Sequence, residues 1–413
     1  VAPGSAAIST LPRVASVPIG VDDADGLVRL ARSEAVELAV VGPERPLADG
    51  LADALRDAGV PTFGPSRAAA RIEASKAFCH DVATAAGVRM ARALVCRSAA
   101  EALTAIADLD RTGDGVVVKE DGLAAGKGVV VYGPGATPAE DARADIGRLF
   151  ALGDATIVVE ERLAGSEASV ITLADGRDLV ALPAARDHKR LLDGDGGPNT
   201  GGMGAYSPLP DLPDDLVEEV LATVHRPILA ELARRGTPFV GALYAGLMLT
   251  SAGPALLECN VRFGDPETQA ILPRLAGPLG PVLLAAAHGT LRTALDAMGV
   301  VGSRLPVLPG ATVGIVLAGG SYPRASSHGD PISGLQAAEA RGGIVFHAGT
   351  RPAADGSYET DGGRVLTVVG RGSDLDGARR AAEHAADAVA FAGAQRRHDI
   401  GADTQPSAAG VAG

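Results

Sequence analysis

The sequence predicts an α/β fold that includes a smaller α+β subdomain. Over residues 1–65, continuous apolar runs alternate with helical segments, which is typical of a parallel sheet covered on both faces. Between about residues 92 and 165 the pattern changes to closely spaced strands with two helices, which favours an α+β arrangement. From about Pro306 strands are again followed by a helix, so we expect a second α/β region there.

The N-terminal region is predicted to contain two short buried strands and three helices. The strands begin at Leu38 and Val60, and each ends in a Gly-Pro turn. Ser66 stands where a hydroxyl would cap a helix that continues to about Gly87. The predicted helices are Leu27–Ala35, Pro46–Ala58 and 67–87.

Further along the chain, strands and helices are separated by a polar, glycine-rich segment from Asp187 to Pro210, which we predict to be a long loop. The predicted strands are Ala93–Cys96, Val116–Lys119, Val129–Tyr132, Ile157–Glu160, Ser169–Leu173, Gly241–Leu249, Ala255–Cys259, Val313–Ala318, Gly343–Ala348 and Arg364–Val369. The predicted helices are Ala99–Leu109, Ala139–Leu152, Asp215–Arg235 and Leu375–Phe391.

Composition limits the class of protein. The 413 residues, 46% hydrophobic and 21% charged, are typical of a globular chain with two to four domains. A net charge of −13 argues against a general nucleic-acid surface. The three cysteines fit no disulfide framework or metal spacing, which indicates a reducing cytoplasm. The apolar stretch Ile271–Leu291 contains Arg274 and three prolines, so we expect no membrane span.

Lysine is rare in this chain: only four of the 37 basic residues are lysines. Three of them lie beside glycine-rich or acidic clusters, where backbone N–H groups and a compact cation can bind an anion together. This distribution predicts an enzyme that handles phosphate, and the alternative is four ordinary surface lysines. The lysines are Lys76, Lys119, Lys127 and Lys189.

Residues 116–132 read as strand, glycine-rich turn and strand. The spacing from Gly122 to Lys127 is one residue short of a P-loop, Gly128 replaces its Ser/Thr, and a strand follows instead of a helix. The P-loop interpretation therefore fails. We predict a hairpin that closes over a polyphosphate through Gly126, Lys127 and Gly128, with Lys119 on the preceding strand; a plain hairpin is the alternative.

Two acidic clusters follow strand-like runs. Glu160 and Glu161 end one strand and Glu167 follows, so carboxylates could meet ribose hydroxyls there, although solvated acids are the alternative. Glu258 and Asn260 share one face of a later strand, because residues two apart point to the same side. A carboxylate with an amide oxygen suits Mg²⁺. Arg262 extends this row and could stabilise a transferring phosphoryl group, unless the row is simply a solvated strand face.

The segment after Asp187 is basic and then rich in glycine, and it is too long for a simple connector. The cluster Asp187-His188-Lys189-Arg190, together with donors at Asn199 and Thr200, would fit an anionic substrate or the terminal phosphate of ATP. His188 is a candidate general base, although a loop histidine more often serves as a hydrogen-bonding group.

The order of these motifs along the chain resembles that of the ATP-grasp ligases. The residues within the motifs resemble those of one family among them, the phosphoribosylamine–glycine ligases (glycinamide ribonucleotide synthetases). The resemblance covers nearly the whole chain, to about Gly401. The runs that carry it are Gly42-Pro-Glu, Asp121-Gly-Leu-Ala-Ala-Gly-Lys-Gly-Val, Asp187-His-Lys-Arg, Gly197-Pro-Asn-Thr-Gly-Gly-Met-Gly-Ala-Tyr-Ser-Pro, Arg262-Phe-Gly-Asp-Pro-Glu-Thr-Gln, Phe346-His-Ala-Gly-Thr and Gly362-Gly-Arg-Val-Leu.

This resemblance implies an ATP-dependent ligation of glycine to 5-phosphoribosylamine through a glycyl phosphate, in purine biosynthesis. It implies that ATP contacts Lys76, Lys119, Gly126, Lys127, Gly128, Glu160, Glu161, Leu163 and Glu167. It implies Mg²⁺ or Mn²⁺ at Glu258 and Asn260, and catalysis by Arg262, Lys189, Asp187 and His188. The implied residues of the glycine and amine sites are Arg190, Asn199, Thr200, Gly201, Gly202 and Asp265.

The resemblance also implies a domain order. We expect an N-terminal βαβ substrate domain over residues 1–75 that lacks the family's first strand and glycine turn, an ATP-grasp domain over 76–290 with a lid at about 92–165, a C-terminal domain over 291–402, and a disordered tail over 403–413. We expect a cytoplasmic monomer whose partners are small molecules, without nucleic acid or membrane. The alternatives are another ATP-grasp carboxylate–amine ligase, or an inactive N-terminally truncated product.

Overall fold

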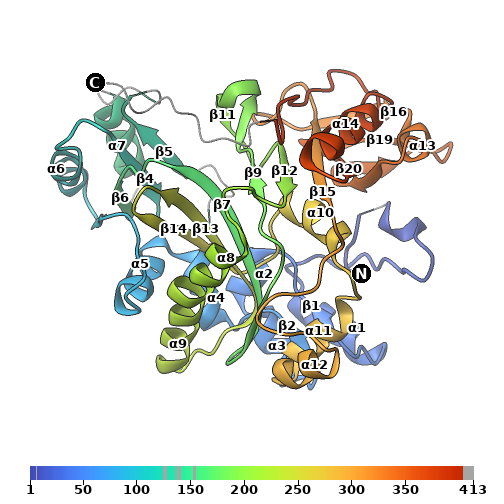
Figure 1. Cartoon of the computed structure of the whole chain (residues 1–413), viewed down its shortest axis with the longest axis horizontal. Coiled ribbons are helices and arrows are strands. Elements are labelled where there is room, and N and C mark those ends of the chain that lie inside the picture. The colour runs from blue at the N-terminus through green and yellow to red at the C-terminus, as the bar shows by residue number, and fades with distance from the viewer. Residues whose placement is uncertain (6, 124–127, 135–136, 138–140, 152–154, 403–413) are drawn as a thin grey trace.

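The computed structural model describes residues 1–5, 7–123, 128–134, 137, 141–151 and 155–402 (Figure 1). In the N-terminal region β1 (Ala39–Val40) pairs in parallel with β2 (Thr62–Phe63), as the strand–helix alternation predicts. The first predicted helix is α1, Ala24–Ser33. The second is divided into α2 (Glu44–Asp49) and α3 (Leu51–Asp57). Gly50 separates them with a φ of 97°, a left-handed conformation that glycine adopts without strain.

The helix predicted over residues 67–87 is also two helices, α4 (Arg67–Ala74) and α5 (Lys76–Ala85). Ser75 breaks the run because its backbone is extended, with φ −142° and ψ 116°. The Ser75 hydroxyl then accepts a hydrogen bond from Phe78 N and caps α5. This break places Lys76 in the first turn of a helix instead of in the middle of one.

The predicted α+β subdomain is present, and it packs around its own apolar core. Its antiparallel sheet has the strand order β3-β6-β4-β5, and Figure 1 shows it beside α6 and α7. The elements are β3 (Ala93–Cys96), α6 (Ala99–Leu109), β4 (Val116–Glu120), β5 (Val129–Tyr132), α7 (Asp141–Ala151) and β6 (Ile157–Glu161).

A second antiparallel sheet, with the order β14-β13-β7-β8, forms the centre of the molecule. Helices α8 and α9, joined through a π-helical turn at Leu221–His225, pack on it through one large apolar core. The elements are β7 (Ser166–Asp175), β8 (Leu179–Ala181), α8 (Asp214–Val220), α9 (Arg226–Arg234), β13 (Val240–Thr250) and β14 (Gly253–Asn260).

The segment predicted to be a long glycine-rich loop contains four strands, so that prediction is wrong. β10 (Arg190–Leu192) and β11 (Gly196–Asn199) form a hairpin. β9 (Arg186–Asp187) and β12 (Gly204–Ser207) extend the C-terminal sheet, whose order is β17-β20-β15-β12-β9. A Cβ atom at Gly204 would lie 2.6 Å from Gly314 O, so glycine there allows β12 to approach its neighbour β15.

The C-terminal region completes the fold. Helix α14 (Leu375–Ala386) ends earlier than predicted, at the Asp387 cap. The other elements there are β15 (Ala311–Ala318), β16 (Ser327–Ile332), α13 (Leu335–Ala340), β17 (Ile344–His347), β18 (Thr350–Pro352), β19 (Tyr358–Gly362) and β20 (Arg364–Gly372). Before them come α10 (Glu267–Ile271), α11 (Gly280–Ala287) and α12 (Leu291–Ala297). None of the helices in the described part of the chain has the length and apolarity to span a membrane. The tail predicted over 403–413 lies outside the described residues.

Candidate functional site

Lys119 lies on β4 and is buried in an ionic chain. Its Nζ is 2.9 Å from Glu160 Oε2 and donates a hydrogen bond of 2.9 Å to Leu257 O on β14. The other Glu160 oxygen lies 2.8 Å from His80 Nε2 on α5. Burial raises the pKa of Glu160, but hydrogen bonds from His80 and the charge of Lys119 outweigh it and hold the pKa below the ordinary value. Glu160 is therefore an ionised carboxylate that fixes the position of Lys119.

Lys76 is held at the start of α5, close to the glycine-rich turn after β4. Its Nζ donates a 2.6 Å hydrogen bond to Gly122 O. The neighbouring Asp121 accepts hydrogen bonds of 3.2 Å from Ser75 Oγ and from Ala77 N, so the turn is tied to the beginning of this helix. Gly128, just before β5, is buried. Gly126 and Lys127, predicted to cap a polyphosphate, lie outside the described residues.

Glu258 on β14 faces several of the predicted cations. Burial raises its pKa, but Lys189, Lys119 and Lys76 together with a hydrogen bond from Asn260 hold the pKa below the ordinary value. Asn260 Nδ2 lies 3.5 Å from Glu258 Oε1, so the two predicted metal ligands are adjacent. An ionised carboxylate beside an amide oxygen is a donor set that fits a hard divalent cation.

Within the described residues there is no group of three or more His, Cys, Asp and Glu side chains that could hold a metal ion. A cation at Glu258 and Asn260 would therefore need further oxygen ligands from phosphate or water, which is the usual arrangement for Mg²⁺.

Lys189 and Asp187 approach this centre from β9 and the residues after it. Lys189 Nζ is 2.6 Å from Glu167 Oε2. Burial lowers the pKa of Lys189, but Glu167 and Glu258 overcome this effect and raise it well above its ordinary value, so the ammonium is charged. Burial, followed by the charge of Glu267, raises the pKa of Asp187 well above normal, and its Oδ1 has no hydrogen-bond partner within the described chain.

Arg262, just after β14, is held by two acids from the N-terminal region. Its Nε lies 3.1 Å from Glu44 Oε2 and 3.6 Å from Glu73 Oε1. Glu73 also accepts a 2.6 Å hydrogen bond from Val261 N. Burial lowers the pKa of Arg262, but the two carboxylates outweigh it and raise the pKa above normal. The sequence analysis gave no role to Glu44, which lies in one of the runs that carry the resemblance, or to Glu73, because no local pattern links them to residues about two hundred positions away.

Glu73 predicts a measurable pH dependence of stability. Burial raises its pKa to about 7 from 4.5, so the folded chain binds a proton that the unfolded chain releases. Its contribution to stability is complete below about pH 4.5 and is lost as the pH rises through 7, a loss of about 3 kcal/mol. The free energy of unfolding, measured with urea at pH 5 and at pH 8, should therefore fall more between these two pH values for the wild type than for Glu73→Gln. Equal declines in the two proteins would contradict this assignment.

The glycine-rich segment is held by the C-terminal region. Arg364 on β20 donates hydrogen bonds to Gly201 O (2.6 Å) and Asp265 O (2.9 Å), and pairs with Asp265 Oδ2 at 2.8 Å. The Tyr322 hydroxyl accepts a 2.8 Å hydrogen bond from Gly201 N. A Cβ atom at Gly202, where φ is 111°, would lie 2.7 Å from Asp187 Oδ1, so this position requires glycine. Arg364 and Tyr322 were not predicted, although Arg364 lies in one of the runs that carry the resemblance.

Thr200 connects the same segment to Lys189. Its N–H and its hydroxyl each donate a 2.8 Å hydrogen bond to Lys189 O, and the hydroxyl oxygen accepts one of 3.0 Å from Gly202 N. The structure thus brings Thr200, Gly201, Gly202, Asp187 and Lys189 together around one turn. That these residues face the amine and glycine substrates stays a prediction.

Other residues predicted for the site make hydrogen bonds away from this turn. Arg190 Nη1 donates to Gly197 O inside the hairpin, where Asn199 is exposed. Glu161 accepts a 2.9 Å hydrogen bond from Arg92 N, which ties β6 to the segment before β3. Leu163 is half-buried after β6.

His188 lies against the hairpin rather than against the lysines. Its Nδ1 is 3.7 Å from Asp195 Oδ1, and its Nε2 is buried without a hydrogen-bond partner within the described chain. Asp195 is also held by the buried Arg397 at 2.7 Å, which fastens the hairpin to the end of the C-terminal region. Asp195 can therefore orient the His188 ring through Nδ1, while Nε2 has no hydrogen-bond partner within the described chain.

Comparisons with known proteins identify the family of this chain. Sequence models of phosphoribosylglycinamide synthetase match the chain with their N domain over residues 1–73, their ATP-grasp (A) domain over 74–268 and their C domain over 312–403. The phosphoribosylamine–glycine ligase of Streptomyces coelicolor is 47% identical over 406 residues, covering 97% of this chain and 92% of that relative. The chain belongs to the phosphoribosylglycinamide synthetase family.

Other relatives and solved structures support the family and its fold. The phosphoribosylamine–glycine ligase of Mycobacterium leprae is 44% identical over 406 residues, covering 97% of this chain and 91% of that protein. The crystal structure of the Thermotoga maritima phosphoribosylamine–glycine ligase superposes with a TM-score of 0.69 at 34% identity, covering 82% of this chain and 81% of that one. An ADP complex of N5-carboxyaminoimidazole ribonucleotide synthetase, 15% identical with a TM-score of 0.60, covers 90% and 85% and shares the fold. The chain therefore has the ATP-grasp fold that its motif order predicts.

Proposed function

We propose that this protein joins glycine to 5-phosphoribosylamine with ATP, giving glycinamide ribonucleotide, ADP and phosphate, in purine biosynthesis. The observation that carries the proposal is that the charges of Lys76, Lys119 and Lys189 all lower the pKa of Glu258, which lies beside Asn260. Lys119 Nζ also donates a hydrogen bond to the carbonyl of Leu257, the residue before Glu258. Such a centre can bind a polyphosphate together with a divalent cation. The names of the close relatives support the choice of glycine and phosphoribosylamine.

In the proposed reaction a glycine carboxylate oxygen attacks the γ-phosphorus of ATP and ADP leaves. The phosphoribosylamine nitrogen then attacks the acyl carbon of glycyl phosphate, phosphate leaves, and the nitrogen loses a proton. Lys76 and Lys119 would bind the α- and β-phosphates, and Arg262 with Lys189 would stabilise charge on the transferring phosphoryl group. Glu258 and Asn260 would hold Mg²⁺ or Mn²⁺, which would neutralise phosphate charge when bound.

The substrates would lie at the turn that contains Asp187, Thr200, Gly201 and Gly202. Asp187 Oδ1, unpartnered within the described chain, is the atom available there to a substrate amine or hydroxyl. Roles for His188, Arg190, Asn199 and Asp265 in substrate binding remain predictions, as do those of Glu160, Glu161, Leu163 and Glu167 towards the adenosine. The capping role of Gly126–Gly128 is also a prediction. The proposal includes a monomeric state and a cytoplasmic location.

The decisive test is ADP release by the chain with MgATP, glycine and freshly generated phosphoribosylamine, with each omitted in turn. We expect ADP only when glycine and the amine are both present. ADP release that depends on bicarbonate or on another amino acid would identify a different ATP-grasp ligase. ATP binding without turnover under every condition would identify an inactive chain.

His80 predicts a selective effect on ATP. In His80→Ala, Glu160 loses the 2.8 Å contact that holds its second oxygen, and Lys119 loses its fixed position. Because hydrogen bonds to charged groups contribute about 1.5–3 kcal/mol, we expect the KM for ATP to rise about tenfold or more while the KM for glycine is unchanged. His80→Gln, which can still donate to Glu160, should restore most of the loss.

The matched control is His328→Ala. His328 is exposed and also pairs with an acid, Asp361, at 2.8 Å, but in the C-terminal region. The His328→Ala variant should have unchanged KM values for ATP and for glycine. If His80→Ala altered the KM values for ATP and glycine equally, a general structural role would replace the role assigned to His80.

A further inference from the structure

Glu267, the first residue of α10, is a buried acid that is not among the predicted site residues. Its side chain belongs to a residue that is only 3% exposed. Oε1 of Glu267 accepts hydrogen bonds of 3.0 Å from Ser169 Oγ on β7 and of 2.9 Å from the Tyr244 hydroxyl on β13, and these two hydroxyl oxygens lie 2.7 Å apart. One oxygen of the carboxylate is therefore held by two neighbouring strands of the central sheet.

The second oxygen of this carboxylate has no partner. Oε2 receives no hydrogen bond from the described residues, and Glu267 forms no ion pair with any of them. A Cβ atom at Gly264 would lie 2.6 Å from Oε2, so the glycine there leaves the space that this oxygen occupies. A buried carboxylate with only neutral partners is unfavourable, because nothing compensates the loss of its hydration. A cation bound to Oε2 would supply that compensation.

Glu267 lies beside the turn where the substrates are proposed to bind. The preceding residue, Pro266, and the Asp187 carboxylate both lie where a Cβ atom at Gly202 would clash. After burial, the charge of Glu267 is the largest cause of the raised pKa of Asp187. Burial lowers the pKa of Arg262, and the charge of Glu267 is among those that raise it. The carboxylate therefore acts electrostatically both on the substrate turn and on the arginine proposed to stabilise the transferring phosphoryl group.

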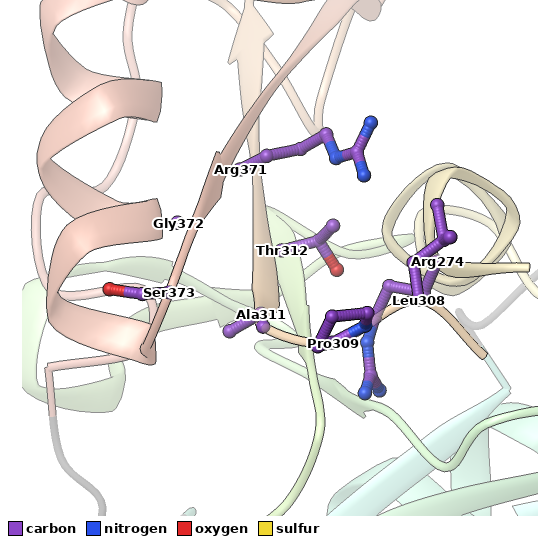
Figure 2. Close-up of a pocket in the computed structure, with 9 residues that line it drawn as sticks. Arg274, Leu308, Pro309, Ala311, Thr312, Arg371, Gly372 and Ser373 are labelled. Carbon is purple, nitrogen blue, oxygen red and sulfur yellow. The ribbon is translucent and has the colours of Figure 1, made fainter.

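The helix that carries Glu267 is also fixed at its other end. Thr312 Oγ1 on β15 donates a 2.5 Å hydrogen bond to Ala270 O, and Figure 2 shows the Thr312 side chain pointing from the strand towards the turn that carries Arg274 (Leu272–Arg274). Arg274 Nη1 in turn donates a 2.7 Å hydrogen bond to Ser207 Oγ on β12. Because α10 is held at both ends, the carboxylate is positioned before any ligand binds, which reduces the entropic cost of binding.

We propose that Glu267 binds the ammonium group of the substrate glycine through Oε2, and that Ser169 and Tyr244 position its carboxylate. An ammonium group supplies the charge and the N–H donors that this oxygen lacks. The nitrogen of phosphoribosylamine must be uncharged to attack an acyl phosphate, so a carboxylate suits the ammonium of glycine better than that amine. This inference rests on the proposed function, because it names the residue that selects the amino-acid substrate of the ligase.

The test is equilibrium dialysis of radiolabelled glycine against the whole chain, with saturating MgADP in the nucleotide site. We expect Glu267→Gln, which keeps the size of the side chain and an oxygen for the two hydroxyls, to bind glycine at least tenfold more weakly, the loss expected for a hydrogen bond to a charged group. Glycolate has a hydroxyl in place of the ammonium, so its affinity, measured by competition with glycine, should be the same in both proteins. The control is Glu231→Gln, a buried glutamate on α9 that pairs with Arg234 and Arg235, and it should bind glycine as the wild type does.

A second variant tests the positioning of the carboxylate. Tyr244→Phe keeps the ring and removes one hydrogen bond from Glu267 Oε1, so it should weaken glycine binding about threefold to tenfold and leave glycolate binding unchanged. This variant decides the question if Glu267→Gln unfolds at a lower temperature than the wild type. A purely structural role would weaken the binding of glycine and glycolate equally.

Three results would overturn the proposal: no glycine binding by the wild type, wild-type glycine affinity in Glu267→Gln, and equal losses of glycine and glycolate affinity in the two variants. Failure of the proposed ligase is a separate result. Glycine binding that depends on Glu267, without glycine-dependent ADP release, would reject the ligase and keep the ammonium site. Glycine-dependent ADP release with a wild-type KM for glycine in Glu267→Gln would keep the ligase and reject the ammonium site.

Discussion

Replacing Glu258 by glutamine is expected to lower kcat about a hundred- to thousandfold, the loss typical of removing one preorganised electrostatic group from a phosphoryl-transfer site. The charges of Lys189, Lys119 and Lys76 hold the pKa of Glu258 below its ordinary value, so its carboxylate is ionised. Glutamine keeps the size of the side chain but removes the charge. The three lysines then lose their common counter-charge, and a divalent cation loses its single carboxylate ligand.

The measurement is the rate of glycine-dependent ADP release as a function of Mg²⁺ concentration. In Glu258→Gln the concentration for half-maximal rate should rise together with the fall in kcat. Glu219→Gln, an exposed change of the same kind on α8, is the control and should behave as the wild type. An unchanged Mg²⁺ dependence in Glu258→Gln would remove this residue from the cation site.

Arg262→Ala is expected to have a comparable effect on kcat, about a hundredfold or more, but with little change in nucleotide affinity. The reason is that Arg262 is positioned by Glu44 at 3.1 Å and Glu73 at 3.6 Å, rather than by the residues around Lys119. Its removal should also destabilise the fold by about 1–3 kcal/mol, because the buried Glu73 loses a compensating charge.

Three measurements separate these effects: kcat, the dissociation constant of MgADP, and the midpoint of urea unfolding. Arg262→Lys keeps the charge and should recover stability more fully than kcat, because a lysine cannot reproduce the planar fork. Arg304→Ala removes a surface arginine paired with Asp214 and serves as the control. A variant with wild-type kcat and reduced stability would make Arg262 a structural residue only.

Local patterns predicted much of the fold. The strands of the α+β subdomain were located from apolar runs, and the structure has them at Ala93–Cys96, Val116–Glu120, Val129–Tyr132 and Ile157–Glu161. Their burial depends on side chains within each run, so the sequence contains the signal. Helix boundaries were less predictable, because the breaks at Gly50 and Ser75 depend on single backbone conformations inside otherwise helical runs.

Part of the candidate site could be predicted because it contains lysine, a residue type that is rare in this chain. Lysine is so rare here that Lys76, Lys119 and Lys189 could be selected from composition alone, and the charges of all three lower the pKa of Glu258. Their supporting partners could not be found in this way. His80 is an ordinary residue in an amphipathic helix, and its contact with Glu160 joins positions 80 residues apart in sequence.

The glycine-rich segment shows why composition can mislead. Its glycines indicate a loop in sequence terms, because glycine is usual at turns. In the structure Gly204 permits close contact between strands, and Gly202 fits against Asp187. These glycines therefore allow tight packing and do not mark chain reversals. This could not be predicted locally, because the strand that packs against Gly204 lies more than a hundred residues further along the sequence.

Because β12 lies between β9 and β15 in the sheet, the chain cannot be divided between these strands without exposing a strand edge. Ala205 and Tyr206 pair with Arg186 and Asp187 on one side, and with β15 on the other. A fragment that ends before β15 would expose the hydrogen-bonding edge of β12, a template for aggregation. The strands from β15 to β20 are thus needed to cover β12, and insertions or split points are best tolerated outside the span from β9 to β20.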